Sequence, residues 1–402
     1  MTHRQFWTLI HRYAGLAMAL FVSVAGLTGT LLAFGPEIER AISPHLFPAP
    51  PVGGVHLGVG ELLARAETLV PHARADGVYL GDRERARVNM HGRPDPVSGQ
   101  STDLPFNELY LSPYTGEELG RSTWGRISQG WFNFMPLVLE IHYSMLMGQL
   151  GAWFFGIVAV VWTLDCFIGL YLTLPSMRAG AAWTQLPRRW TPAWRIKRGS
   201  SRYRLHFDLH RAGGLWMWAL LGLFAWSGVL MNLANEVYFP VMEGVATFSR
   251  PEVRIPLRPV PVDDPRLSWQ AAQAQAEQLM AEQATRFGFT VVRPERFYLD
   301  RLRGVYFYDV HSSLDFQDRR GATTIYFDAD TGELRLVLLP RGQWSGNTIT
   351  NWLIALHEAN VFGLPYRLIV AMLGLAIAAL SVTGVLVWWR KRLARRTIAT
   401  NG

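Results

Sequence analysis

The chain has 402 residues, of which 50% are hydrophobic and only 17% are charged, below the roughly 25% of an average soluble domain. This composition excludes a disordered or collagen-like protein. The single cysteine, Cys166, excludes a disulfide scaffold, covalent c-type haem and multi-cysteine zinc or iron–sulfur sites. The net charge of +8 indicates nucleic-acid binding only until the distribution of the basic residues is considered.

Four apolar segments are long enough to cross a bilayer as helices, which takes about 20 residues. In chain order they are residues 14–34, 152–175, 212–234 and 368–389. The second is interrupted by one charge, Asp165. The first is followed by Pro36 and Glu37 rather than by a small-residue cleavage site, so we expect an uncleaved signal anchor.

The distribution of charge predicts the orientation of these spans. Residues 177–211 carry nine Lys/Arg and one acid, and the tail after Trp389 carries five Lys/Arg and no acid. The segments 35–150 and 236–364 together carry 22 Lys/Arg and 29 Asp/Glu. The positive-inside rule therefore predicts that both termini and the basic loop are cytoplasmic and that the two long segments lie outside. The basic excess is topological, and nucleic-acid binding loses its only support.

The sequence contains an internal duplication. Residues 10–16 match residues 209–215, and the same offset aligns Thr28-Gly29 with Ser227-Gly228. A second offset aligns His142 with His357, Gly169 with Gly384 and Asp165 with Leu380. The chain therefore reads as two tandem copies of one unit, span–external segment–span, and we expect a pseudo-twofold axis along the membrane normal to relate them.

Each external segment predicts an α+β module with a three- or four-stranded antiparallel sheet. Amphipathic helices are expected at 59–70 and 269–287. Strands are expected at 77–80, 86–90 and 108–111 in the first module and at 287–292, 305–310 and 323–327 in the second. Each module ends in a Thr-Gly-Glu turn, at 112–117 and 328–333, where the glycine supplies a positive φ.

Two His-Arg-x-x-Gly spans, two return spans led by a histidine and two modules ending in Thr-Gly-Glu resemble the PepSY-associated transmembrane family over essentially the whole chain. The resemblance implies a four-helix transmembrane bundle built from two tandem repeats, each with a PepSY-like periplasmic domain. It also implies a multi-pass protein of the bacterial inner membrane. Family members linked to iron acquisition include ferric-siderophore reductases that carry b-type haem.

On this basis we predict the following organisation: transmembrane helix 1 at 1–35, periplasmic domain 1 at 36–140, transmembrane helix 2 at 141–176, a basic cytoplasmic loop at 177–211, transmembrane helix 3 at 212–235, periplasmic domain 2 at 236–356, transmembrane helix 4 at 357–389 and a cytoplasmic tail at 390–402.

His11 and His210 are the expected ligands of a cytoplasmic-side haem b. Each is followed four residues later by a glycine, Gly15 or Gly214, on the same helix face. A glycine there leaves room for a porphyrin plane, and two symmetry-related histidines on facing helices suit bis-histidine ligation. The alternative is that each His-Arg pair anchors a helix end at the membrane surface.

Three neighbouring residues complete this site. Arg12 and Arg211 are expected to pair with haem propionates by charge-assisted hydrogen bonds. His206, one turn before His210, is the second-ranked ligand because Trp7 holds its place in the first repeat.

His142 and His357 are the expected ligands of a second haem b near the outer surface. Each ends an apolar helical stretch that a glycine-containing break separates from the following span. The alternative is a buried histidine in a helix–loop contact. For Asp165, the favoured interpretation is a bundle-facing carboxylate satisfied by a Trp, Ser or Asn such as Ser227 or Asn232, and the alternative is a proton relay.

The resulting hypothesis is a dihaem b membrane reductase that takes electrons from quinol or from a separate cytoplasmic reductase and reduces a ferric siderophore in the periplasm. Iron leaves as Fe(II), which oxygen ligands bind weakly. Membrane lipid is a further partner, because the basic loop carries tryptophans suited to anionic headgroups. The alternatives are a non-enzymatic PepSY module that binds or regulates a periplasmic protein, and a carrier for haem or metal.

Overall fold

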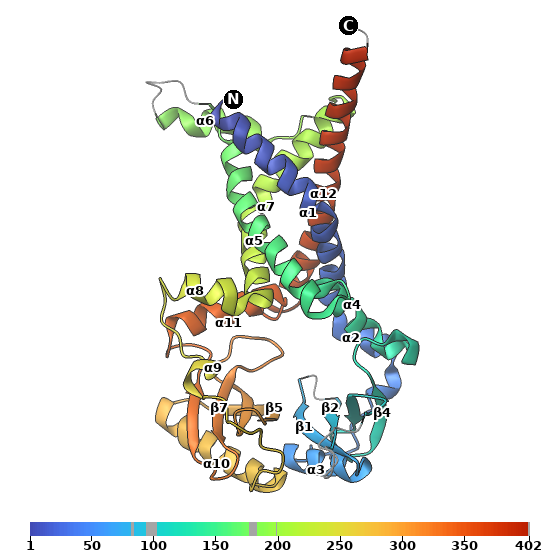
Figure 1. Cartoon of the computed structure of the whole chain (residues 1–402), viewed down its shortest axis with the longest axis vertical. Helices are drawn as coiled ribbons and strands as arrows, with labels where there is room; N and C mark the ends of the chain where they lie inside the picture. The colour runs from blue at the N-terminus through green and yellow to red at the C-terminus, as the bar shows by residue number, and fades with distance from the viewer. Residues whose placement is uncertain (82–83, 94–102, 177–182, 198, 401–402) are drawn as a thin grey trace.

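The computed structural model describes residues 1–81, 84–93, 103–176, 183–197 and 199–400 and consists of a helical bundle joined to a β-sheet part (Figure 1). Both chain termini lie at the end of the bundle far from the sheet (Figure 1). We call this end the terminus end and the opposite one the sheet end. Within the described ranges, four helices are long and apolar enough to cross a membrane: α1 (His3–Leu32), α5 (Gly148–Thr173), α7 (Arg202–Asn232) and α12 (Gly363–Thr400).

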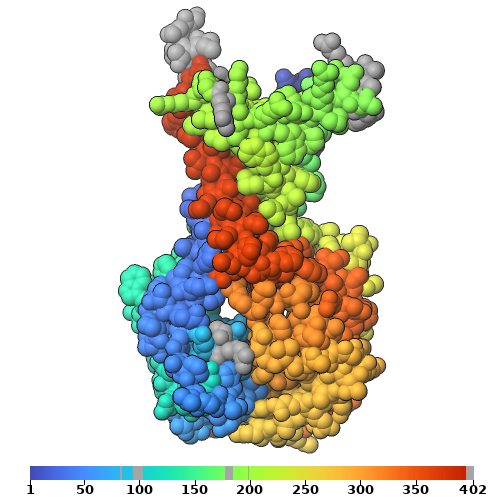
Figure 2. Space-filling model, turned by 180° about the vertical axis from the view of Figure 1, so that it is seen from behind, coloured from blue at the N-terminus to red at the C-terminus, as the bar shows by residue number. Residues whose placement is uncertain are grey.

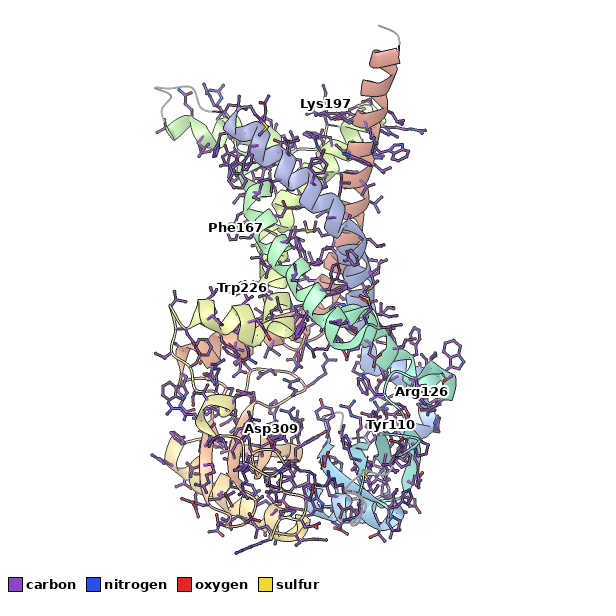
Figure 3. The ribbon with its side chains drawn as sticks, in the orientation of Figure 1. Tyr110, Arg126, Phe167, Lys197, Trp226 and Asp309 are labelled. Atoms are coloured by element: carbon purple, nitrogen blue, oxygen red, sulfur yellow. The ribbon has the colours of Figure 1, made fainter. Side chains whose placement is uncertain are left out.

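The four predicted spans are confirmed, and three of them run further than their apolar segments. Polar and basic residues extend α1, α7 and α12 at the terminus end, because the helical hydrogen bonds continue where the hydropathy pattern stops. Apolar side chains also cover the outside of the bundle. Phe167 of α5, for example, is 59% exposed and lies on the bundle surface (Figure 3), as expected of a lipid-facing residue.

The bundle is closely packed where small residues meet. Helix α1 packs mainly against α12, and α5 against α7. A Cβ atom added at Gly26 of α1 would lie 2.6 Å from the carbonyl oxygen of Gly374 of α12, so only glycine permits this approach. Small residues at helix contacts are the usual means of packing within a membrane, where apolar burial alone gives no net gain.

Shorter helices connect the bundle to the sheet and close its ends. Helices α4 (Phe134–Ser144) and α11 (Ser345–His357) precede α5 and α12, and each is separated from its span by residues with positive φ, including Met145 and Ala359. A break before each span is present as predicted, but it precedes the helix, whereas the sequence predicted it at residues 147–151 and 363–365, most of which belong to α5 and α12. The remaining short helices are α2 (Gly35–Ile42), α6 (Leu186–Trp190), α8 (Phe239–Met242) and α9 (Pro251–Arg254), with a π-helical turn at Ala234–Tyr238 and 3₁₀ turns at Pro44–Leu46, Ile127–Gln129, Trp131–Asn133, Trp183–Gln185 and Thr191–Trp194.

The sheet part is one antiparallel sheet with the strand order β4-β3-β2-β1-β5-β6-β7-β8. The strands are β1 (Ala73–Tyr79), β2 (Ala86–Gly92), β3 (Glu108–Leu111), β4 (Glu118–Ser122), β5 (Val291–Asp300), β6 (Val305–Ser312), β7 (Thr323–Asp328) and β8 (Leu334–Leu338). This order is symmetrical about the β1–β5 pair, as the predicted twofold relation between the repeats requires. Figure 2 shows the first module, in blue, and the second, in orange, side by side beneath the bundle.

Each module consists of one helix and four strands. Helices α3 (Val59–Leu69) and α10 (Trp269–Phe287) contact each other and cover the sheet face turned away from the bundle (Figure 1). Their apolar faces bury Leu62, Leu63, Phe297 and Phe327 in one continuous core. Burial of such side chains contributes about 1.5–3 kcal/mol each, which makes this face the main source of stability of the sheet part.

The fusion of the two modules into one sheet is a feature that the sequence analysis did not predict. Strands β1 and β5 pair through Gly77–Tyr298, Val78–Phe297 and Tyr79–Arg296. Gly77 allows this pairing because a Cβ atom there would collide with the ring of Tyr298.

The bounds and number of the strands also differ from the predictions. The strand predicted at 287–292 begins only at Val291, because Phe287 is the last residue of α10 and Gly288 ends that helix with a φ of 69°. Strands β4 and β8 were not predicted as separate elements. The predicted turns are confirmed, since Gly116 and Gly332 have φ values of 70° and 74°.

Candidate functional site

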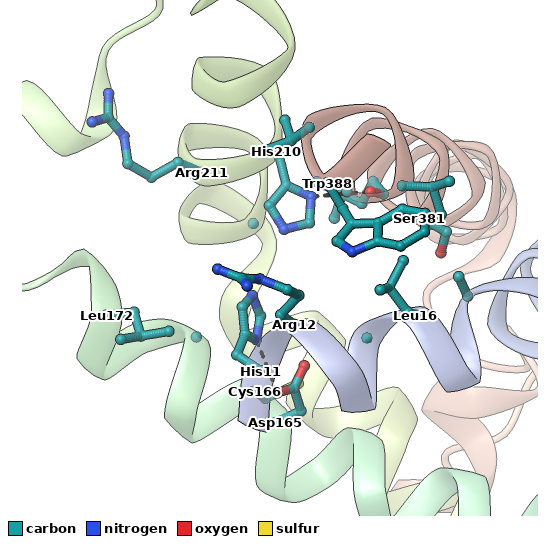
Figure 4. A pocket seen from close by; sticks show the side chains of 18 of the residues that line it. His11, Arg12, Leu16, Asp165, Cys166, Leu172, His210, Arg211, Ser381 and Trp388 are labelled. Atoms are coloured by element: carbon teal, nitrogen blue, oxygen red, sulfur yellow. Dashed lines mark hydrogen bonds and ion pairs between the residues drawn. The ribbon is translucent and has the colours of Figure 1, made fainter. Parts of the chain in front are cut away.

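The bundle brings together the first pair of predicted histidines. His11 of α1 and His210 of α7 come from different repeats, and their ring centres lie 6.1 Å apart. Both line a cavity of about 450 Å³ near the terminus end, within the 300–1,000 Å³ typical of cofactor pockets. Figure 4 shows the two imidazoles pointing toward each other across this cavity.

The second pair has the same arrangement at the sheet end. His142 of α4 and His357 of α11 also come from different repeats, and their ring centres also lie 6.1 Å apart. Both line a second cavity of about 470 Å³, surrounded mainly by apolar side chains. The ring of Phe224 packs 5.1 Å from that of His357 and limits its rotation. The four histidines are therefore grouped in the two predicted pairs.

Each of the four imidazoles uses Nδ1 in a hydrogen bond with the protein. Nδ1 of His11 donates to Asp165 at 2.8 Å, and Nδ1 of His210 donates to the carbonyl oxygen of Leu380 at 3.0 Å. At the sheet end, Nδ1 of His142 lies 2.9 Å from the hydroxyl of Thr28, and Nδ1 of His357 lies 2.6 Å from that of Ser227.

These contacts determine which ring nitrogen is available to a ligand. The hydroxyls of Thr28 and Ser227 donate to carbonyl oxygens of their own helices, so each accepts the Nδ1–H of its histidine. A neutral imidazole has one N–H, and therefore Nε2 carries the free lone pair in all four rings. Among the described residues, no Nε2 atom of these four histidines has a hydrogen-bond partner.

The spacing of each pair fits one metal atom between two imidazoles. A metal–imidazole bond is about 2.0–2.1 Å and the ring centre lies roughly 1 Å further on, so two rings on opposite sides of one metal have centres about 6 Å apart. The observed 6.1 Å in both pairs matches this value. The described residues contain no group of three or more His, Cys, Asp or Glu that could hold a metal ion.

Glycines shape the terminus-end cavity. Gly15 and Gly214 line the terminus-end cavity, and a Cβ atom added at either would meet nothing within 4 Å. They therefore adjoin open space, as predicted. Gly169 and Gly384 have a different role that the sequence analysis missed, because a Cβ atom there would lie 3.5 and 3.1 Å from the imidazoles of His11 and His210. These two glycines pack behind the rings, and their repeat-related positions were the available signal.

The three residues predicted to complete this site, Arg12, Arg211 and His206, differ in their positions and contacts. Arg12 lines the terminus-end cavity, and no hydrogen bond or ion pair joins its guanidinium to another described residue, so it remains available to an anionic group. Arg211 also lines the cavity, but its guanidinium donates to Asp208 at 2.8 Å and to backbone carbonyls of the basic loop. Figure 4 shows Arg211 directed away from the two imidazoles and Arg12 beside them. His206 is not among the residues that line this cavity.

Asp208 accounts for the position of Arg211. This fully buried carboxylate accepts from Arg204 and Arg211 and from the backbone N–H of Lys197, which lies at the terminus end (Figure 3). It thereby fastens the basic loop to α7. Arg12 is therefore available to bind an anion in this cavity, whereas the charge of Arg211 is already paired with that of Asp208.

Asp165 faces the bundle interior, as the favoured interpretation predicts, but its partner is not a Trp, Ser or Asn. The structure pairs its carboxylate with His11, whereas Ser227 binds His357 and Asn232 binds backbone carbonyls. The cause is the rotation of α5, which turns Asp165 toward α1 inside the cavity wall, and sequence alone does not give that rotation. The partner explains how an intramembrane carboxylate is tolerated, since its side chain is only 7% exposed but hydrogen-bonded.

The two cavities are neighbours. Val22, Trp162 and Ile377 line both of them. His11 and Gly29, which packs against His142, are 18 residues apart on α1, or about 27 Å along the helix. The two histidine pairs therefore lie near opposite ends of the bundle, while a single layer of side chains separates their cavities.

One face of the sheet turns toward the bundle (Figure 1), and charged side chains of β5 and β6 form pairs there. Arg296 forms an ion pair with the buried Asp309, and Arg293 lies 2.8 Å from the buried Glu295. Burial raises the pKa of Glu295 to about 7 even though Arg293 lowers it. This face offers polar and charged contacts beneath the sheet-end histidines.

Comparison with known proteins gives one positive result. No curated protein matches the chain. The sequence model of the PepSY-associated TM region family matches residues 8–391, a range that contains both histidine pairs and the sheet and reaches into all four spanning helices. The chain therefore belongs to the PepSY-associated TM region family.

Proposed function

We propose that this protein is a dihaem b-type inner-membrane reductase that passes electrons across the membrane to a ferric siderophore in the periplasm. The observation that carries the proposal is the presence of two histidine pairs. In each pair the ring centres lie 6.1 Å apart, and each pair lines a cavity of cofactor size. Bis-histidine ligation is a common way to hold a b-type haem in a helical bundle.

A bound haem would supply reversible one-electron transfer between ferric and ferrous iron. Nε2 of His11 and His210 would hold one haem, and Nε2 of His142 and His357 would hold the other. Both histidines of a pair would be engaged in holding the group, so the chemistry that it would supply is electron transfer rather than the binding of oxygen or of another small ligand.

The protein's own contribution is orientation and exclusion of water. Asp165, the carbonyl of Leu380, and the hydroxyls of Thr28 and Ser227 hold the four imidazoles in one tautomer. Arg12, which lines the terminus-end cavity, would pair with a propionate. Trp162 lines both cavities, so its side chain would lie between the two haems.

The direction of the proposed reaction comes from charge. The basic loop and tail favour a cytoplasmic terminus end, where quinol or a separate reductase would deliver electrons. A reporter fused after Gly402 is expected in the cytoplasm and one inserted near Arg93 in the periplasm. The opposite result would exchange the donor and acceptor sides.

The ferric-siderophore substrate is proposed from the resemblance to iron-acquisition members of the family, together with the polar sheet face beneath the second histidine pair. The test is a stopped-flow experiment under anaerobic conditions. Purified protein is reduced with stoichiometric dithionite and mixed with a ferric trihydroxamate siderophore, with ferrozine present to trap Fe(II). We expect haem oxidation with the release of two Fe(II) per chain, one for each electron stored.

The controls are variants of single histidines. His357→Ala is expected to abolish rapid Fe(II) release, whereas His206→Ala should retain it, because His206 lies outside the cavity lining. Reduced wild-type protein that is oxidised no faster by the ferric complex than by the iron-free siderophore would overturn the proposed activity. A colourless purified protein would instead favour a module that binds a periplasmic partner.

A further inference from the structure

The two terminus-end histidines differ in the group that accepts their Nδ1–H. Asp165 and Leu380 occupy equivalent positions of the duplication, and each supplies the acceptor for one Nδ1–H. In the first repeat the acceptor is a carboxylate at 2.8 Å from His11, whereas in the second it is a backbone carbonyl at 3.0 Å from His210.

The sheet-end pair lacks this difference. Thr28 and Ser227 are also equivalent in the duplication, and both present a hydroxyl to the histidine of their site. Both acceptors at the sheet end are therefore neutral. Of the four histidines, only His11 is hydrogen-bonded to a group that carries a formal negative charge.

Burial makes this charge effective. The side chain of Asp165 is 7% exposed, and among the described residues its only ion pair or side-chain hydrogen bond is the one to His11. Arg4, Arg12, Arg211 and Lys391 also line this cavity, but among the described residues none of them forms an ion pair with Asp165. A hydrogen bond to an ionised acceptor is about twice as strong as one between neutral groups, and it acts over a short distance in a medium of low dielectric constant.

A carboxylate that accepts the Nδ1–H of a ligating histidine raises the basicity of that ligand. A more basic axial ligand, with a negative charge nearby, stabilises ferric iron relative to ferrous iron. The reduction potential of the site therefore falls. A carbonyl or hydroxyl acceptor has the same effect to a smaller degree.

We propose that Asp165 is a positioning residue that sets the reduction potential of the terminus-end site below that of the sheet-end site, so that electrons move toward the sheet end spontaneously. The proposal rests on the function proposed above, in which each histidine pair holds one haem. In the transfer, one electron leaves the terminus-end site, which is oxidised, and enters the sheet-end site, which is reduced. No bond forms or breaks and no proton is required.

The test is a spectroelectrochemical titration of the purified dihaem protein. We expect two resolved potentials in the wild type. Asp165→Asn keeps an acceptor oxygen of the same size but removes the charge, so it should raise the lower potential and leave the higher one unchanged. The matched control, Ser227→Ala, changes a neutral acceptor at the sheet end and should affect only the higher potential.

A second measurement assigns the potentials without changing Asp165. His357→Ala should retain only the terminus-end haem and show the lower potential, and His210→Ala should retain only the sheet-end haem and show the higher one. This comparison stands even if Asp165→Asn fails to fold. Equal or reversed potentials in the two single-haem variants would overturn the inference, as would an unchanged lower potential in a dihaem Asp165→Asn protein.

The two proposals fail in different ways. A wild-type protein that binds no haem contradicts the proposed function itself. A protein that binds two haems whose potentials are equal, or are ordered in the opposite direction, contradicts only the role of Asp165.

Discussion

Replacement of Gly214 by leucine should separate folding from cofactor binding. A Cβ atom at this position meets nothing within 4 Å and faces the cavity of about 450 Å³. The leucine side chain adds four carbons, which occupy roughly 100 Å³ if each takes about the volume of one water molecule. It would therefore fill about a quarter of this cavity and leave less room for a porphyrin.

The same geometry predicts that the fold of Gly214→Leu survives. The new side chain enters an open apolar cavity without a collision, and burial of a leucine contributes about 1.5–3 kcal/mol. The helix is also stabilised by the loss of a glycine, which is about 1 kcal/mol less favourable than alanine in a helix interior. The variant should be expressed at wild-type yield and unfold at an equal or higher temperature, but lose one of two haems.

The assay is haem content per chain by pyridine haemochrome, with thermal unfolding as the folding measurement. Gly222→Leu is the matched control, since Gly222 lies on the same helix, also has open space around it and lines neither cavity. Gly222→Leu should keep both haems. A Gly214→Leu protein with two haems and a wild-type spectrum would refute the assignment of this cavity to a porphyrin.

Three further outcomes follow from the structure. Ser227→Ala removes the hydroxyl that orients His357, and we expect faster haem loss from the sheet-end site to apomyoglobin, with the other site unaffected. Gly77→Ala places a methyl group against the ring of Tyr298, and thermal unfolding in detergent should show a loss of about 1–3 kcal/mol from overpacking at the joint between the modules. Burial alone would raise the pKa of Asp328, but backbone N–H groups of its turn and two guanidinium groups lower it to about 2. This pKa lies below that of an aspartate in the unfolded chain, so above pH 4 the ionised carboxylate adds about 2 kcal/mol to the free energy of unfolding. That contribution is lost as the pH falls toward 2. Thermal unfolding of Asp328→Asn between pH 4 and pH 2 should therefore lack this loss of stability.

The parts of the fold that could be predicted depend on patterns that are visible in the sequence itself. Hydropathy predicted the four spans, because a membrane helix must be apolar over about 20 residues. Duplication predicted the histidine pairs, since equivalent positions of two repeats meet at a twofold axis. Gly116 and Gly332 marked turns that only a positive φ allows.

The parts that could not be predicted depend on contacts between distant segments. The partner of Asp165 lies 154 residues away in the chain and is selected by the rotation of α5 against α1. The β1–β5 joint needs the edges of two modules to meet, and neither edge strand carries a signal for it. The duplication aligned Thr28 with Ser227 and so indicated that they share a role. That role, a hydrogen bond to an imidazole, depends on how the helices pack and could not be predicted from the alignment.

The most direct test of the account is the number of haems that each chain binds. Wild-type protein purified from cells supplied with a haem precursor should give two haems b per chain by pyridine haemochrome, with the sharp α-band of low-spin haem in reduced-minus-oxidised spectra. His11→Ala and His142→Ala should each give one haem per chain, and the double variant should give none. A colourless wild-type protein, or single variants that keep two haems with unchanged spectra, would contradict the assignment of the four histidines.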